Sequence, residues 1–524
     1  MTPENLESRM PRIGAFVLET LTTGMYTNPL DTLREYVQNS FDAIREAERS
    51  GLLSNGAGRI EISVDEGSRN LAMRDNGTGI LANNVNSRLV NIGMSSKSIL
   101  ADAGFRGIGR LAGIAYCRRL VFRTQSNGDF DISSVAFDCD ELRQAMSPRM
   151  KQVKELADVI NSYASVTTEK TRKKDHFLEV TMEGINEVGQ SFLEWKKINT
   201  YLCQVAPVGL DMQSFHHAGT IHQWLRVHNI AVPVVSIIIT SGSTNYQVFK
   251  PYRKLTYTTI REKHKIHVKG IRFFPENAGP DSPFWGWYAE TNCPGTFGDD
   301  TVAGFRLRKA NIGIGMADRM TEIFAEASES YARFNNYFMG EIHIQDSNII
   351  PNARRDGFED SHEWTAIWKS LVDFARERSR EAHQLSQARN LDIERLVGPA
   401  EREIAAANKK RKTGLASKDE KSRVLEKIDS QIDKLDAAKK AERNESEQNE
   451  IDRVRKELQK TRQSIEHETT FVVQKLSASL DKKQRKIISE IIGILYDMLD
   501  EDSFEKARDA ILAKYQVPDK ENDR

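Results

Sequence analysis

Residues 31–49 read DTLREYVQNSFDAIREAER, and this stretch decides the fold of the N-terminal part of the chain. Its apolar residues recur every three or four positions, which predicts a helix with one buried stripe. The stripe consists of Leu33, Val37, Phe41 and Ile44. Such a stripe has to be buried against another element, and a sheet is one of the layers that can cover it.

Strand patterns follow this helix. Residues 59–64 (RIEISV) alternate between polar and apolar, residues 70–74 (NLAMR) continue after a turn, and residues 120–124 and 177–182 have similar patterns. Helices over a mainly antiparallel sheet indicate an α+β fold, built as an α/β sandwich.

Glu35, Asn39 and Asp42 lie on one face of the helix, beside the apolar stripe. A partly shielded carboxylate at Glu35 is suited to activating a water molecule. The amide oxygen of Asn39, one turn later, is a hard ligand that Mg²⁺ accepts. Taken alone, the pattern is more typical of an ordinary solvated helix face than of a catalytic site.

The segment MRDNGTGI, residues 73–80, brings Asp75 from a strand into a turn built on Gly77 and Gly79. These glycines let the backbone pass close to a flat ligand, and a buried carboxylate can accept a hydrogen bond from an exocyclic amine. An ordinary Asn-Gly hairpin turn is the alternative.

The segment GFRGIGRLAG, residues 104–113, is the third candidate. The amides of Gly104, Gly107 and Gly109 lead toward a helix and can form a cradle for phosphate. The preceding SKSILADA is not a strand, which argues against a dinucleotide fingerprint. No GxxxxGK[ST] occurs, which excludes a P-loop by motif.

In order and spacing, ExxxNxxDA, DxGxGI and GxxGxG resemble the N, G1 and G2 boxes of the GHKL ATPase superfamily. The superfamily includes gyrase, heat-shock chaperones, histidine kinases, MutL repair proteins and MORC proteins. The resemblance implies a Bergerat fold that binds ATP and Mg²⁺. It assigns adenine recognition to Asp75, Mg²⁺ binding to Asn39 and the general base to Glu35.

The segment TTGMYTNPLDTLRE, which leads into the first box, resembles the corresponding segment of the ninety-kilodalton heat-shock chaperones, and two further stretches resemble these chaperones as well. NIGMSSKS, residues 91–98, resembles the lid over ATP, with Ser96 and Lys97 as phosphate contacts, although Lys97 also fits a solvated loop. IIPNARRDGFE, residues 349–359, resembles the middle-domain segment that sends a catalytic arginine to the γ-phosphate. Arg355 matches that arginine, with Arg354 as the alternative. A surface turn with two solvated arginines is the competing explanation, and the three upstream boxes favour the catalytic role.

One departure from these families concerns residues 175 and 176. The chaperone and repair families have Gly-Thr before the last strand of the nucleotide domain, whereas this chain has Asp175-His176. One contact on the adenine side is therefore in question.

The chain divides by composition into four expected parts: an ATP-binding domain over residues 1–200, a transducer-like middle domain over 201–370, a helical and coiled-coil segment over 371–470, and a helical C-terminal element over 471–524 with a disordered tail. Within the second part, the Pro- and Gly-rich residues 273–300 indicate an irregular loop. Residues 401–467 contain no proline and no aromatic residue, and their apolar seam fits either a helical hairpin or a stuttering coil.

The overall charge gives little indication of a partner, because 75 basic residues balance 75 acidic ones. Four dispersed cysteines predict isolated reduced thiols, and the longest apolar stretch, residues 230–240, is too short for a bilayer span and indicates a buried strand. We therefore expect a cytoplasmic protein without membrane association.

Two functions compete for this sequence. The first is an ATP-gated homodimeric clamp that acts on protein clients, as a chaperone does. The second is a clamp on nucleic acid, similar to MORC proteins, in defence against foreign DNA. The sequence does not decide between a protein client and DNA.

Overall fold

The helix expected over residues 31–49 is α2 (Asp31–Arg49). In the computed structural model, its apolar stripe is at most 3% exposed and packs on the alternating buried residues of β1 and β2. Burial of each such large side chain stabilises the fold by about 1.5–3 kcal/mol. The structure describes residues 13–17, 19, 28–91, 109–147, 155–260, 265–292, 295–390, 393–415, 418–440, 443, 445–467 and 480–515.

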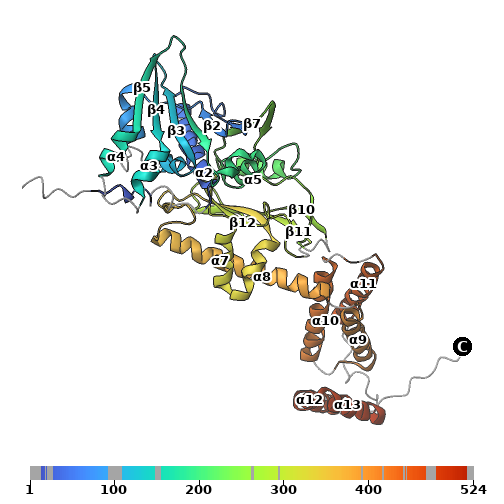
Figure 1. Ribbon diagram of the computed structural model, residues 1–524. Helices are drawn as coiled ribbons and strands as arrows, with labels where there is room; N and C mark the ends of the chain where they lie inside the picture. Colours follow the sequence, from blue (N-terminus) through green and yellow to red (C-terminus); the bar gives the residue numbers. More distant parts are fainter. Residues whose placement is uncertain are drawn as a thin grey trace, which may run out of the picture. The chain divides into compact units, whose positions relative to one another are not determined.

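The first sheet has eight strands in the order β5-β4-β3-β6-β2-β1-β7-β8, and every pairing is antiparallel except β1 with β7. Figure 1 shows these strands side by side in the N-terminal part of the chain. Their bounds are β1 (Arg59–Asp65), β2 (Asn70–Asp75), β3 (Cys117–Gln125), β4 (Asp131–Asp138), β5 (Ala164–Lys170), β6 (Phe177–Ile185), β7 (Ser236–Ser241) and β8 (Thr244–Gln247). The mixed α+β fold is therefore confirmed.

The helices around this sheet are α3 (Cys139–Met146), α4 (Leu156–Tyr163) and α5 (Trp195–Val205), whereas α6 (Ala218–Val227) packs in a separate core with Trp285 and Trp287. The sheet continues beyond residue 200, because β7 pairs in parallel with β1 from Arg59↔Ser236 to Val64↔Ser241. Of the strand expected over residues 230–240, only the part from Ser236 onward forms. Pro233 lacks the N–H that a ladder needs, so the pairing begins after it.

The second sheet has the order β13-β12-β14-β11-β10-β9, with β12 and β14 parallel. Its strands are β9 (Thr256–Thr258), β10 (Lys265–Phe274), β11 (Phe284–Thr291), β12 (Gly304–Lys309), β13 (Ile312–Ile314) and β14 (Met339–Ile344). The expected loop over residues 273–300 is partly wrong, since β11 lies inside it. Trp285 and Trp287, two positions apart on β11, are both buried. Antiparallel pairing with β10 and β14 supplies hydrogen bonds to the backbone of β11.

Helices α7 (Asp318–Ala327) and α8 (His362–Asn390) accompany the second sheet, and Figure 1 shows both beside β12. The chain separates into two compact units, residues 1–291 with 296–379, and residues 292–295 with 380–524. Both sheets belong to the first unit.

The second unit is helical, with α9 (Ile393–Thr413), α10 (Lys418–Lys439), α11 (Glu445–His467), α12 (Lys482–Met498) and α13 (Glu501–Tyr515). Helices α9, α10 and α11 share one core, which includes Val397, Ile428 and Val454. Of the two arrangements considered for residues 401–467, the hairpin is the one observed, with α9 as a third helix. The expected disordered tail lies outside the described residues.

The cysteines depart from expectation in one respect. Cys117 and Cys139 are fully buried, and their Sγ atoms lie 3.9 Å apart, so these two thiols touch without being bonded. Their strand and helix bring together residues that are 22 positions apart. Among the described residues, no helix is long and apolar enough to cross a membrane.

Candidate functional site

Helix α2 carries the centre of the site. Glu35 lies on this helix with a side chain that is 12% exposed, and its Oε1 is 3.2 Å from Nε of Arg355. The two residues are 320 positions apart and belong to the two sheet domains. The structure thus brings together the predicted base and the predicted catalytic arginine, while Arg354 stays exposed to solvent.

The turn over residues 351–358 holds Arg355 in place after β14. Arg355 has a φ of 57°, in the left-handed region, which its own N–H stabilises by donating to the carbonyl of Asn352 at 3.1 Å. Its carbonyl accepts from the backbone N–H of Gly315 at 2.7 Å, and Asn352 Nδ2 donates to Asp356 Oδ1 at 2.7 Å. Strain of this kind costs about 1–3 kcal/mol and persists only where the surroundings enforce it.

Arg34 ties this turn to α2. It is 5% exposed, and its Nη2 donates to the backbone carbonyl of Arg354 at 2.8 Å. Asp31 lies 3.8 Å from the same guanidinium and accepts a hydrogen bond from Tyr201 Oη at 2.6 Å. Sequence reasoning missed Arg34, because its partner is a backbone atom 320 positions away.

Asp75 lies at the end of β2, is 2% exposed, and faces the same helix. Its Oδ2 accepts from Ser40 Oγ at 2.7 Å, and its Oδ1 accepts from the N–H of Gly77 at 2.9 Å. Burial raises the pKa of Asp75 to about 6, against the opposing effect of these hydrogen bonds. Ser40 was not predicted, although it directly follows Asn39 in the sequence.

The glycines occupy positions that no side chain could fill. A Cβ at Gly77 would lie 2.7 Å from Cβ of Ala43, and one at Gly79, where φ is 63°, would overlap the carbonyl of Gln125. A Cβ at Gly109 would overlap the carboxylate of Glu35. Gly109, the first described residue of the third predicted motif, therefore lies directly against Glu35, the predicted base.

The short helix from Gly109 to Ala115 is fixed to α2 through one phenol. Tyr36 Oη donates to the carbonyl of Arg110 at 3.2 Å and accepts from the N–H of Gly113 at 3.1 Å. Burial lowers the pKa of Arg110 to about 10. Of the predicted phosphate contacts, Ser96, Lys97, Gly104 and Gly107 lie outside the described residues.

At the position where the sequence departs from the chaperone pattern, His176 lies against the glycine turn, with its Nδ1 2.8 Å from the carbonyl of Gly77. Thr124 Oγ1 donates to the carbonyl of Phe177 at 2.7 Å and accepts from the N–H of Ile80 at 2.9 Å. Thr124 on β3 and His176, directly before β6, therefore hold the glycine turn that follows β2.

The site on α2 therefore extends from Asp75 to Glu35. Ser40 and Glu35 are five residues apart, which corresponds to roughly 7.5 Å along a helix. Asn39 lies on the same helix, one turn after Glu35. The arrangement provides a buried acceptor at one end and a carboxylate paired with an arginine at the other.

Residues 26–167 match the model of the family described as histidine kinase-, DNA gyrase B- and HSP90-like ATPase. This part of the chain is therefore similar to GHKL-type ATPase domains. The match supports ATP binding and hydrolysis and includes Glu35, Asn39, Asp75 and the three glycines at the site. Comparison with curated proteins gave no match.

Proposed function

We propose that this chain is an ATP-driven conformational machine in which Arg355 of the second sheet domain completes the nucleotide site of the GHKL domain. The observation that supports the proposal best is the contact between Arg355 Nε and Glu35 Oε1 at 3.2 Å. A contact across two domains makes hydrolysis depend on how those domains meet.

In the proposed reaction, Glu35 takes a proton from the attacking water while the new P–O bond forms and the bond to the ADP oxygen breaks. In the structure, the guanidinium of Arg355 is paired with Glu35. The γ-phosphate of ATP competes for the guanidinium, because an arginine fork suits phosphate oxygens. Binding of ATP then frees Glu35 and places a positive charge where the transition state develops negative charge.

In this scheme, Asp75 accepts a hydrogen bond from the exocyclic amine of adenine, and Asn39 would hold Mg²⁺. The donor type fits this ion, because an amide oxygen is a hard ligand and Mg²⁺ at nucleotide sites takes few protein oxygens besides phosphates and water. When bound, the ion would neutralise charge on the phosphates.

Steady-state ATP turnover of the full chain tests the proposal. We expect Arg355→Ala to lower kcat by about 10³-fold, the lower range for an arginine acting on a transferring phosphoryl group, with nearly unchanged nucleotide affinity. Arg354→Ala is the matched control. The side chain of Arg354 is exposed, and its backbone carbonyl, which accepts from Arg34, is kept in this variant. Normal turnover by both variants would leave only the nucleotide-binding part of the proposal.

We further propose a homodimeric clamp that acts on a protein client. The described part of the helical unit offers some support, because several of its basic side chains already pair with acidic ones. The pairs are Arg455 with Asp436, Arg462 with Asp429, Lys439 with Asp452, and Arg453 with Glu450 and Glu401. Basic side chains that are already paired with carboxylates neutralise the phosphates of a nucleic acid less effectively. DNA affinity that falls steeply with log salt would support the nucleic-acid clamp instead.

A further inference from the structure

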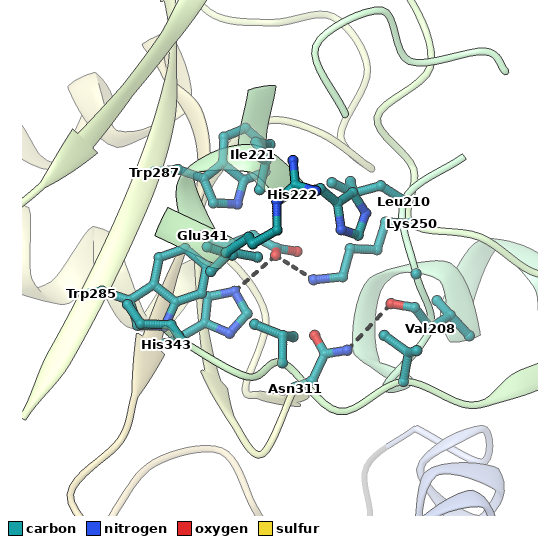
Figure 2. A pocket seen from close by; sticks show the side chains of 16 residues that line it. Val208, Leu210, Ile221, His222, Lys250, Trp285, Trp287, Asn311, Glu341 and His343 are labelled. Atoms are coloured by element: carbon teal, nitrogen blue, oxygen red, sulfur yellow. Dashed lines mark hydrogen bonds and ion pairs between the residues drawn. The ribbon is translucent and has the colours of Figure 1, made fainter. Parts of the chain in front are cut away.

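The second sheet domain contains a cavity that the ATPase reaction does not use. Its volume is about 240 Å³, and Figure 2 shows the side chains around it. Helix α6, β11, β14 and the residues flanking β7 and β13 supply the lining. An apolar cavity of about 150 Å³ accommodates benzene, so this volume has room for a ligand of one or two rings.

The walls of the cavity are apolar and rigid. Ile221 and Leu225 come from α6, and Trp285 and Trp287 come from one face of β11. The two indoles are at most 2% exposed. Trp285 stacks on His343 with ring centroids 4.3 Å apart, and Trp287 meets Tyr252 edge to face at 4.9 Å. Fixed flat walls of this kind favour a planar ligand.

One corner of the cavity is charged. Glu341 pairs with Lys250, and its Oε1 also accepts from Arg308 Nε at 2.6 Å. Burial opposes ionisation of Glu341, but Arg308 and Lys250 outweigh it and hold its pKa well below the usual range. Burial and the charge of Arg308 lower the pKa of Lys250 to about 7. An ammonium group has three donors, and Glu341 takes one of them.

Asn311 provides the second polar group. It is 1% exposed, and its Nδ2 donates to the carbonyls of Pro233 at 2.8 Å and Val208 at 3.4 Å. These two acceptors fix the orientation of the amide, because a flipped oxygen would face carbonyl oxygens. Its Oδ1 is buried without a hydrogen-bond partner, which is unfavourable unless a ligand supplies a donor. Figure 2 shows this oxygen and the Lys250 amine facing the same part of the cavity.

We propose that this cavity binds a small uncharged heteroaromatic molecule of nucleobase size, which donates a hydrogen bond to Asn311 Oδ1 and accepts one from Lys250 Nζ. The adjacent N–H and carbonyl groups of a nucleobase or an aromatic amide match this donor and acceptor pair. The proposal is separate from the ATPase site, because it uses none of the residues around Glu35 and Asp75.

Such a base reaches the cavity either free or as part of a nucleotide. His222 and Arg226 lie four residues apart on α6, line the cavity and are exposed to solvent. Arg226 can therefore contact the phosphate of a nucleotide whose base is inside. Arg226→Ala should weaken the binding of a nucleotide and leave that of a free base unchanged.

The test is calorimetric titration of the full chain with uracil, cytosine, hypoxanthine and nicotinamide, and with the 5′-monophosphates of uridine and cytidine. Each titration is repeated in Asp75→Ala, so that binding through the nucleotide site is recognised by its loss there. We expect at least one compound to bind equally well to the wild type and Asp75→Ala. If none of them binds, the proposal is overturned.

Two variants and one control locate the binding. Leu225→Trp fills the cavity and should abolish binding, and Lys250→Met should weaken it about tenfold or more by removing one charge-assisted hydrogen bond. Val227→Ala is the control, because this residue lies on the same helix, is 71% exposed and does not line the cavity. Thermal unfolding checks each fold; if Lys250→Met does not fold, Leu225→Trp decides. Unchanged affinity in folded Leu225→Trp overturns the assignment.

Discussion

At the scale of single residues, the site depends on groups whose environment sets their chemistry. Asp75 is buried, but it is held by Ser40 and the N–H of Gly77. When ionised it only accepts hydrogen bonds, and protonation turns one of its oxygens into a donor. The sequence predicted Asp75 and the glycine turn. It could not predict Ser40 as its partner, because no local pattern links positions 35 residues apart.

A pH dependence of nucleotide affinity follows from Asp75. Because burial raises its pKa to about 6 in the folded protein, the carboxylate is lost as the pH falls through that value. We expect ATP affinity to decrease below pH 6, by up to about tenfold per pH unit, without a matching loss above it.

The same group has an opposite effect on stability. Its pKa is raised from an unfolded value near 3.8, so its contribution to the free energy of unfolding is present below pH 3.8 and lost as the pH rises through 6. Calorimetry of the wild type and Asp75→Ala between pH 5 and 8 separates the two effects. Affinity that is flat across this range in the wild type would remove Asp75 from adenine recognition.

At the scale of elements, α2 and the strands next to it were predictable because their apolar periodicity is local. The helix over residues 31–49 formed as expected, and β1 and β2 extended the predicted strands by one residue each. The parallel pairing of β1 with β7 and the strand β11 were not predicted. Both depend on hydrogen bonds to distant strands, which override the local signals of proline and glycine.

Arg34 connects α2 with the turn that carries Arg355, and we predict that it acts by positioning. Arg34→Ala removes the hydrogen bond to the carbonyl of Arg354 and should lower kcat by roughly tenfold, with ATP affinity little changed, since one hydrogen bond from a charged group contributes about 1.5–3 kcal/mol. A double-mutant cycle with Arg355→Ala measures the coupling.

If Arg34 acts through Arg355, the double variant turns over ATP no more slowly than Arg355→Ala alone. Arg34→Lys is a useful companion, because a lysine keeps the charge but not the planar donor geometry. Additive losses in the cycle would mean that Arg34 has a separate, structural role.

At the scale of the whole molecule, we predict that binding and hydrolysis can be separated. Glu35→Ala should bind Mg-ATP but hydrolyse it about a hundredfold more slowly, since a general base typically contributes 10²–10⁴-fold.

If closure by ATP drives dimerisation, this variant should accumulate as a dimer with ATP. Light scattering with and without nucleotide measures the mass. A monomer under both conditions contradicts the clamp, and turnover equal to that of the wild type contradicts the role of Glu35.

The three-residue strand β13 has a consequence for how the two sites communicate. Asn311, at the cavity, immediately precedes this strand, and Gly315, which follows it, donates its N–H to the carbonyl of Arg355. If a cavity ligand shifts ATP affinity through this strand, thermodynamic linkage requires ATP to shift the affinity of that ligand by the same factor.

Titration of the cavity ligand with and without a non-hydrolysable ATP analogue measures that factor, and we expect the two dissociation constants to differ by about fivefold or more. Equal constants would mean that the two sites act independently. With coupling of this size, the chain responds to the concentrations of two metabolites through one conformational equilibrium, and neither of them alone determines how fast ATP is consumed.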